Sequence, residues 1–386
     1  MKKILPVVAA ALLCLSFSGP VKAEPTSPEW TPIDNPETHK GLVLEPRLMH
    51  WRDKLFLFWA GTSEAALNPE VYYTSREKKD TSWNKTKAPF FGQDVGNVRH
   101  IAIATARDLM AVIFQHRGNQ GDRAVEVMMA SSRDNGYSFT HPLVVDSYVL
   151  GETGGSTVAI GARQGAQRPE FAATWIAENG VLRAANIDPR SSFRPVAQVV
   201  GNVKEQDTTV QVVGNGGDGF YVVWPEGGAL KSAHIKPLTG NAEDTKEILK
   251  GSFKKNFSCC SNYHGPAYLV ADNEGGTELN AMVEKGGKFT PLGETVHSPL
   301  AGRNLQSRSS VDETNNRLHV AMLDSKDINK LYYMSTRDGK WSAPELVLDL
   351  DPSIPVTGFD ICATDDTVWI TASQGQLLFI RKRKIK

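Results

Sequence analysis

One short turn sequence returns along this chain, and the repetition limits the folds that the chain can adopt. The turn is complete at residues 132–139, which read SRDNGYSF, and it recurs in shortened form at residues 335–341, which read STRDGKW. An Asp side chain accepts hydrogen bonds from backbone amides two residues on, and Gly takes positive φ without strain. The pattern therefore predicts a β-hairpin that is written several times.

The aromatic residue that closes each hairpin gives the length of the repeat. Successive closing aromatics are separated by 53, 56, 54, 96 and 52 residues. Because the gap of 96 residues equals two steps, one copy lacks its aromatic marker and seven units result. The markers are Trp30, Trp83, Phe139, Phe193, Phe289 and Trp341.

Each unit also contains a short apolar strand between its markers. Examples are residues 54–59 (KLFLFW), 219–224 (GFYVVW) and 317–322 (RLHVAM). Strands that are apolar on both faces are typical of sheets packed between neighbouring sheets. A period near 50 residues with about four strands per unit predicts an all-β fold, a seven-bladed β-propeller.

The two ends of the chain predict how the ring closes. After Trp341 there is room for three strands, around Phe359, Trp369 and Phe379, while residues 30–33 (WTPI) resemble an unpaired fourth strand. We expect this N-terminal strand to complete the last blade, because closure removes the exposed sheet edges of an open array.

The first residues predict export from the cytoplasm. Two lysines lead into an apolar stretch from Ile4 to Phe17, and a small-residue end at residues 21–23 follows. This is the order of a cleaved secretory signal. We expect residues 1–23 to be that signal and residues 24–386 to form one propeller domain, periplasmic or secreted. No later stretch reaches the roughly 18 apolar residues of a membrane span.

The charge balance argues against nucleic acid as a partner. The chain has 43 basic and 43 acidic residues, and the expected signal contains three lysines and no acid, so the mature chain carries a net charge of −3. Proteins that bind nucleic acid normally show a clustered basic excess.

The hairpin motif, Ser-x-Asp-x-Gly-x-x-aromatic, resembles the Asp-box, or bacterial neuraminidase repeat, of sialidase-like propellers. As architecture the resemblance covers nearly the whole mature chain, and it implies that the motif residues are structural and lie on the blade rim. Sialidases typically have six blades, so six is the alternative to seven. The motif residues are Ser132, Asp134, Gly136 and Phe139 in the complete copy and Asp338, Gly339 and Trp341 in an altered one.

Sialidases grip the carboxylate of their substrate with three arginines, whose planar forks match a carboxylate. Three arginines here lie near the starts of predicted inner strands, which line the central channel of a propeller. As a cluster, Arg47, Arg99 and Arg308 can bind an anionic ligand. Alternatively, each pairs with a local carboxylate. The local carboxylates are Glu45, Asp94 and Asp312.

Catalytic candidates are weaker. Sialidases use a tyrosine nucleophile, and such a nucleophile needs a nearby base. Tyr263 and His264 directly precede residues 265–270, which we predict to be an inner strand, so both can face the channel mouth. Glu205 or Asp207 can enter from a preceding loop. No pair has a spacing that requires a catalytic role, so catalysis stays open.

Two adjacent cysteines are the second unusual feature. Cys259 and Cys260 can form a strained vicinal disulfide, offer thiolates to a soft metal with His264 as a third ligand, or remain buried thiols. Cys362 belongs to a non-adjacent blade. In an oxidising compartment we favour a disulfide, with the vicinal pair as the easier bridge. No other cofactor is expected.

Two functions from different classes follow. The favoured one is a monomeric ligand-binding or protein-interaction propeller, whose partner is an acidic glycan at the central channel or another extracytoplasmic protein. Arg47, Arg99, Arg308 and His264 would then contact the ligand. The alternative is a glycoside hydrolase of the exo-sialidase type. The first is favoured because a full set of rim hairpins accompanies an incomplete catalytic set, and fold alone does not fix function.

Overall fold

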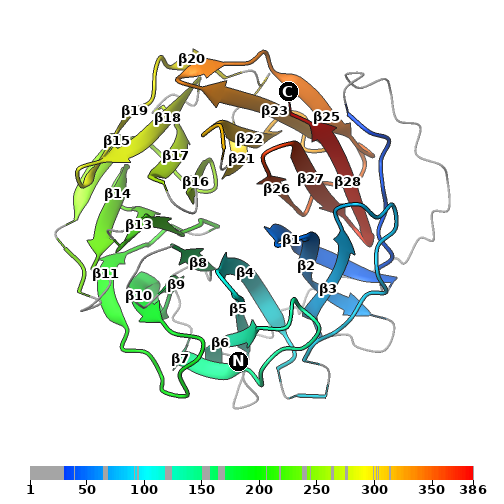
Figure 1. The fold of residues 1–386 in the computed structure, drawn as a ribbon. Coiled ribbons are helices and arrows are strands. Elements are labelled where there is room, and N and C mark those ends of the chain that lie inside the picture. The colour runs from blue at the N-terminus through cyan, green and yellow to red at the C-terminus, as the bar shows by residue number, and fades with distance from the viewer. Residues whose placement is uncertain are drawn as a thin grey trace, which may run out of the picture.

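The computed structural model confirms the predicted all-β propeller with seven blades (Figure 1). Apart from one 3-10 turn, η1 (Glu178–Gly180), the regular elements of the described residues are all strands. The structure describes residues 30–385 except for positions 39, 64–67, 91, 94, 118–123, 150–156, 164–169, 206, 217–218, 237–240, 244, 262–264, 274–276, 299, 301, 303 and 313.

Each blade is an antiparallel sheet whose strands follow one another from the centre of the ring to its rim. The innermost strands are β1 (Lys40–Trp51), β4 (Val98–Ala106), β8 (Val158–Ala162), β12 (Gln211–Asn215), β16 (Phe257–Ser261), β21 (Asn304–Val311) and β26 (Gly358–Ala363). The second strands are β2 (Lys54–Ser63), β5 (Leu109–Arg117), β9 (Phe171–Ile176), β13 (Gly219–Pro225), β17 (Ala267–Asp272), β22 (Leu318–Asp324) and β27 (Thr367–Gln374).

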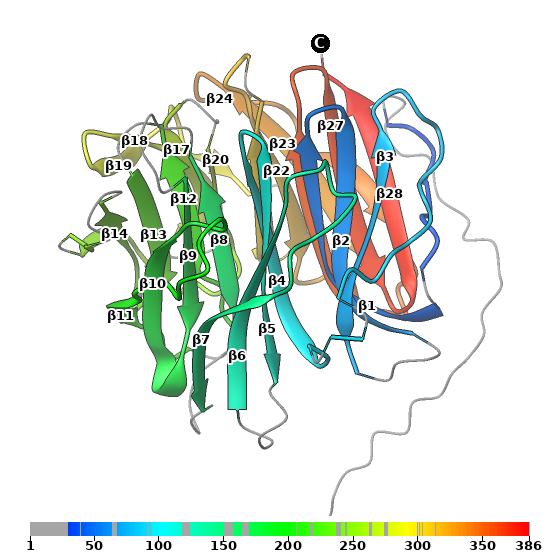
Figure 2. The same cartoon turned by 60° about the horizontal axis from the view of Figure 1, so that its bottom comes forward.

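The third strands are β3 (Glu70–Glu77), β6 (Ala124–Ser132), β10 (Val181–Ile187), β14 (Ala229–Ile235), β18 (Glu278–Lys285), β23 (Lys330–Arg337) and β28 (Leu377–Lys384). The rim strands are β7 (Leu143–Val149), β11 (Gln198–Asn202), β15 (Lys246–Lys250), β19 (Lys288–Pro291), β20 (Val296–His297), β24 (Lys340–Trp341) and β25 (Glu345–Asp349). Each innermost strand contacts the next around the ring, and β26 contacts β1. Figure 2 shows the blades as separate twisted sheets.

Burial explains why the second strands are apolar throughout. Every residue of β9 and of β13 is buried, because each strand packs against the blades on both sides. Trp59, Trp175 and Trp224, from three different second strands, are at most 1% exposed. Burying such a large side chain stabilises the fold by roughly 2–3 kcal/mol, so the second strands contribute strongly to the core between blades.

The N-terminal segment closes the ring as predicted. Antiparallel backbone hydrogen bonds join Asp34 to Ile380 in both directions, at 2.9 and 2.8 Å, and Thr31 donates to the carbonyl oxygen of Lys382 at 2.9 Å. The side chain of Trp30 is 5% exposed and packs in the same core as Phe379. The last blade therefore takes its fourth strand from the other end of the chain.

The complete hairpin joins two blades at the rim. Ser132 Oγ donates to Asp134 Oδ1 (2.9 Å) and accepts the Gly136 amide hydrogen (3.0 Å), and Gly136 has a φ of 78°. The ring of Phe139 meets the ring of Tyr73 edge-on at 5.5 Å between centroids. Because Tyr73 belongs to the preceding blade and its hydroxyl donates to the Gly136 carbonyl (2.8 Å), the turn also fixes the blade spacing.

The other hairpins keep less of this geometry. Asp338 has a φ of 51° and its side chain is 91% exposed, so it occupies the left-handed position that Asn135 takes in the complete copy. Gly339 follows it with a φ of 78°, and Trp341 is half-buried. Phe193 is 82% exposed, so this predicted closing aromatic does not pack beneath its turn.

One strand assignment from the sequence was wrong. Residues 265–270 were expected to form an inner strand, but β17 (Ala267–Asp272) is the second strand of the fifth blade. The innermost strand is β16, which contains both adjacent cysteines. The pattern misled because β16 carries the polar sequence FSCCS, whereas the run that follows it is apolar enough for either place.

Candidate functional site

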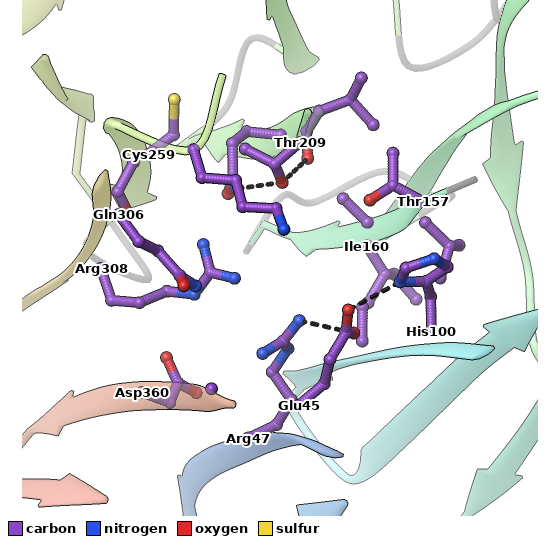
Figure 3. Close-up of a pocket in the computed structure, with 18 of the residues that line it drawn as sticks. Glu45, Arg47, His100, Thr157, Ile160, Thr209, Cys259, Gln306, Arg308 and Asp360 are labelled. Atoms are coloured by element: carbon purple, nitrogen blue, oxygen red, sulfur yellow. Dashed lines mark hydrogen bonds and ion pairs between the residues drawn. The ribbon is translucent and has the colours of Figure 1, made fainter. Parts of the chain in front are cut away.

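The innermost strands frame a cavity of about 460 Å³ at the centre of the ring (Figure 3). Side chains from all seven blades line it, and charged groups dominate one wall. We call it the channel cavity. Its ionisable lining residues are Glu45, Arg47, His100, Asp207, Lys255, Cys259, Arg308 and Asp360.

Glu45 is the centre of one hydrogen-bonded group. Its carboxylate accepts from Arg47 Nη2 at 3.1 Å and from His100 Nδ1 at 2.7 Å. Arg47 Nε also donates to the carbonyl oxygen of Ile101 at 3.1 Å. The pairing of β1 with β2 shifts register between Leu44 and Arg47, and Glu45 has a φ of 48°. This bulge turns Glu45 and Arg47 toward the neighbouring blade, where His100 lies.

Charge decides the ionisation of Glu45. Burial alone would raise its pKa, but the charge of His100, the hydrogen bond from His100 and the charges of Arg47 and Arg308 outweigh burial. The pKa of Glu45 is therefore held far below its usual value. Arg47 and Glu45 form an internal ion pair at neutral pH, so part of the positive charge of this wall is already compensated.

Arg308 is held differently. Its Nη1 donates to the carbonyl oxygen of Ser307 at 3.3 Å, and the guanidinium points into the same space as that of Arg47 (Figure 3). Among the described residues it forms no ion pair. Burial and the charge of Arg47 lower the pKa of Arg308 to about 10, although Asp360 and Glu45 act in the opposite direction. Arg308 remains a cation at neutral pH.

Asp360 completes the charged wall from the last blade. Its Oδ2 accepts the backbone amide hydrogen of Leu48 at 2.8 Å, which ties β26 to β1. Burial raises the pKa of Asp360, while Arg47 and Arg308 oppose that shift. Two carboxyl groups on one wall therefore have pKa values that move in opposite directions, Glu45 down and Asp360 up.

The remaining lining of the channel cavity is a mixture of hydroxyl groups and apolar side chains. Thr157 and Thr209 lie on the wall across from the arginines, and Ile160 lies between them and His100 (Figure 3). Lys255 and Asp207 form an ion pair, and Asp207 is exposed. The cavity thus offers cations on one side and hydrogen-bonding and apolar groups on the other.

The three described cysteines lie around a second cavity of about 440 Å³, which shares Cys259 and Asp360 with the first. All three are free cysteines in this structure, and the disulfide favoured from the sequence stays a prediction. Cys259 packs on the fourth-blade side of β16 and Cys260 on the sixth-blade side. Successive residues of a strand point to opposite faces, and this separates the two adjacent sulfur atoms.

Burial keeps these thiols protonated. It raises the pKa of Cys260 and of Cys362 to about 12 and that of Cys259 well above its usual value. Within the part of the chain that the structure describes, no group of three or more His, Cys, Asp or Glu side chains is placed to hold a metal ion. His264, the third ligand considered from the sequence, lies outside the described residues.

The structure brings together some of the sequence candidates and separates others. Arg47 and Arg308 line the channel cavity, and Asp207 lies at its edge. Arg99 is exposed and does not line it, because the pairing of β4 with β5 shifts register between Val98 and His100 and leaves Arg99 as the extra residue. Glu205 is half-buried away from the cavity lining. Tyr263 and His264 lie outside the described residues.

Sequence reasoning missed His100 and Asp360 and gave Glu45 only the role of a local partner. His100 directly follows Arg99 in the sequence. The position of the β-bulge decides which of the two lines the cavity, and that position was not known from the sequence. Asp360 follows the buried Phe359 on a strand whose alternation places every second residue at the channel wall. That alternation was available from the sequence.

Comparison with known proteins supports the fold. No protein-family model and no curated protein sequence matches the chain. Among solved structures, a lectin of Aleuria aurantia in complex with Fucα1-6GlcNAc has a TM-score of 0.50 at 10% identity, over 89% of this chain and 93% of the lectin. A protein of unknown function from Dyadobacter fermentans has a TM-score of 0.48 at 10% identity, over 93% of this chain and all of that one.

A third solved structure is the endosialidase of phage phi92, with a TM-score of 0.49 at 7% identity, over 93% of this chain and 69% of the enzyme. The likeness to the Aleuria aurantia lectin is one of fold alone, so the site has to be argued from the residues of this chain. None of the described segments forms an apolar helix long enough to cross a membrane.

Proposed function

We propose that this propeller binds an acidic sugar in the channel cavity and that Arg308 receives the carboxylate of the sugar. The proposal rests on the contacts of the Arg308 side chain. Its guanidinium faces the cavity, donates to the backbone carbonyl of Ser307, and has no ion pair among the described residues. Since a guanidinium has five N–H donors, several remain for a ligand.

The geometry of guanidinium suits the carboxylate of an acidic sugar. Two parallel N–H groups match two carboxylate oxygens, and such bidentate pairs are stronger than neutral hydrogen bonds. Arg47 points into the same space and can add a second donor group, although Glu45 already holds its Nη2 at 3.1 Å. Partial burial of both arginines strengthens their attraction for an anion.

The opposite wall supports a sugar as the rest of the ligand. The hydroxyl groups of Thr157 and Thr209 and the amide of Gln211 can bond sugar hydroxyls, while Ile160 offers an apolar surface. The Aleuria aurantia lectin, which shares the fold, holds a fucosylated disaccharide. From this lectin we take only the class of ligand, a carbohydrate. The acidic group of the ligand is inferred from the arginines of this chain.

The cell location and the role of the rim hairpins belong to the same proposal. Residues 1–23 have the pattern of a secretory signal, so we propose that the protein works in the periplasm or outside the cell as a monomer. The hydrogen bonds of Ser132, Asp134 and Gly136 support the assignment of residues 132–139 to an Asp-box with a structural role. An acidic glycan of the cell exterior would then be within reach.

Isothermal titration calorimetry tests the proposal with N-acetylneuraminic acid and its methyl ester, which removes the charge and keeps the ring. We expect the acid to bind and the ester to bind at least tenfold more weakly. Arg308→Ala should reduce the affinity for the acid at least tenfold, and Arg308→Lys should restore only part of it because the fork is lost.

Arg99→Ala is the matched control, since Arg99 is an exposed arginine outside the channel cavity. Its affinity for the acid should equal that of the unmodified protein. Equal binding of acid and ester, or full affinity in Arg308→Ala, would overturn the proposal. A screen of neutral and acidic glycans on an array would then identify the true class of ligand.

A glycoside hydrolase is the second candidate function, and one observation favours it. Glu45 and Asp360 lie on one wall with pKa values shifted in opposite directions, which is the arrangement of a carboxylate beside a general acid. Release of the aglycone from 4-methylumbelliferyl N-acetylneuraminic acid, abolished in Asp360→Asn, would support it. Absence of release by the unmodified protein would exclude this substrate and leave binding as the function.

A further inference from the structure

A separate cavity lies at the rim of the ring, beside the first blade and away from the channel cavity. It measures about 340 Å³ and is bordered by β2, β3, the segment after β3 and the complete hairpin of the second blade. We call it the rim cavity. Its lining residues include Lys54, Tyr73, Glu77, Asn84, Lys87 and Tyr137.

Lys54 is the feature that points to a ligand. Only 7% of this residue is exposed, yet its ammonium group reaches the rim cavity and forms no ion pair and no side-chain hydrogen bond with any described residue. Its Nζ lies 4.1 Å from the ring centroid of Tyr137. Glu77, its cross-strand neighbour, is paired instead with Lys79 at 3.2 Å. A largely buried cation without a carboxylate partner is costly unless an anion compensates it.

Tyr137 supplies the second element of the site. It is 66% exposed, although aromatic side chains of this size normally bury their rings. The ammonium group of Lys54 forms a cation–π contact with this ring. The exposed ring offers an apolar face at the entrance, of the kind that packs against the C–H face of a sugar.

The charge around the entrance is also favourable to an anion. Two further lysines, Lys85 and Lys87, line the cavity and are exposed. Two carboxylates line it as well, Asp80 and Glu77, and the latter is already paired with Lys79. The amide of Asn84 also lines the cavity and can hydrogen-bond to hydroxyls.

We propose that the rim cavity is a second saccharide site, which binds a sugar that carries an anionic group. The anionic group reaches Lys54, and the ring of the sugar packs on Tyr137. This site is separate from the channel cavity and does not depend on Arg308. The related hairpin at residues 335–341 has Lys340 in the place of Tyr137, so it lacks the aromatic element of the site.

Isothermal titration calorimetry with galactose 6-sulfate, galactose and inorganic sulfate tests this site. We expect galactose 6-sulfate to bind and the other two to bind at least tenfold more weakly. Lys54→Met removes the charge and keeps the length of the side chain, and Tyr137→Ala removes an exposed ring without disturbing the core. Each should weaken the binding of galactose 6-sulfate at least tenfold.

Two control variants distinguish the rim cavity from the channel cavity and from any exposed aromatic ring. Arg308→Ala alters the channel cavity, and Phe193→Ala removes an aromatic ring that is also exposed on a rim. Both should bind galactose 6-sulfate with unchanged affinity. Loss of binding in Arg308→Ala, equal binding of inorganic sulfate, or full affinity in Tyr137→Ala would overturn the proposal, and so would a failure of the unmodified protein to bind. If Lys54→Met does not fold, Tyr137→Ala decides.

Discussion

Arg381 donates from Nε to the carbonyl oxygen of Thr31 at 2.6 Å, and the two residues are 350 positions apart in the chain. The same guanidinium donates to the carbonyl oxygens of Val347 at 2.7 Å and of Trp30 at 3.3 Å. It therefore ties the N-terminal segment, the sixth blade and the last blade together. The residue is only 6% exposed, so water cannot replace these bonds.

Arg381→Ala should destabilise the closed ring. Hydrogen bonds to a charged group contribute about 1.5–3 kcal/mol each, and their loss would leave buried carbonyl groups without donors. We expect the free energy of unfolding to fall by at least about 3 kcal/mol in chemical denaturation. Lys384→Ala, on the same strand but exposed, should change it by less than about 0.5 kcal/mol. Equal stabilities of the two variants would show that closure depends on other contacts.

Gly136 should be irreplaceable for two separable reasons. Its φ is 78°, and a Cβ atom there would lie 2.4 Å from Cε1 of Phe56. Gly227 has a φ of 64° and open space where its Cβ would be, so Gly227→Ala measures the backbone strain alone. We expect a loss of about 1 kcal/mol for Gly227→Ala and about 3 kcal/mol for Gly136→Ala, because overpacking adds to the strain. Similar losses would mean that Phe56 yields easily.

Most of the fold could be predicted from the sequence because every blade of a propeller has the same packing requirement. The second strand of each blade must be apolar on both faces, and every residue of β9 and of β13 is indeed buried. The closure by Trp30 followed from counting strands at the two ends. The fifth blade was misread because its innermost strand, β16, is short and polar, and periodicity alone cannot rank an apolar run as first or second in a blade.

The site was less readable, because it depends on bulges and on contacts between blades. The register shift at Glu45 and Arg47 brings them to His100 of the next blade, and the shift before His100 turns Arg99 away. A bulge changes the face of the sheet on which a side chain lies. Neither bulge contains a glycine that would mark it in the sequence. The arginines could be placed at inner strands, whereas their directions could not.

Glu45 should act as an internal competitor for the acidic ligand of the channel cavity. Its carboxylate occupies Arg47 Nη2 at 3.1 Å, a donor that a ligand carboxylate could otherwise use. Glu45→Gln keeps the shape and removes the charge. We expect N-acetylneuraminic acid to bind about tenfold more tightly to this variant, a gain of about 1.4 kcal/mol in calorimetry. Weaker binding would show that Glu45 is needed chiefly to orient Arg47.

The three thiols should be unreactive until the protein unfolds. Burial raises the pKa of Cys260 and of Cys362 to about 12, and only the thiolate attacks a disulfide reagent. We expect 5,5′-dithiobis(2-nitrobenzoic acid) to react slowly with the native protein at pH 8. After unfolding without reductant, protein that lacks residues 1–23 should give three thiols per chain. One thiol per chain would reveal the disulfide that the sequence favoured.

Asp272 should make the protein less stable as the pH rises. It is 1% exposed, accepts hydrogen bonds from the side-chain amides of Asn304 (3.2 Å) and Asn256 (3.4 Å), and has no ion pair within the described residues. Burial raises its pKa to about 6, against the opposing effect of these hydrogen bonds. The native state therefore binds its proton more tightly than the unfolded chain does, for which the pKa is 3.8.

The free energy of unfolding should consequently fall between pH 4 and pH 6 and level off above that range, as far as Asp272 contributes. A shift of this size corresponds to about 3 kcal/mol, since one pKa unit is about 1.4 kcal/mol. Asp272→Asn removes the titration, so the stability difference between pH 4 and pH 8 should become about 2 kcal/mol smaller than in the unmodified protein, because part of the loss is already complete at pH 4. Urea denaturation at the two pH values measures it. An unchanged difference would show that Asp272 reaches solvent or a cation in solution.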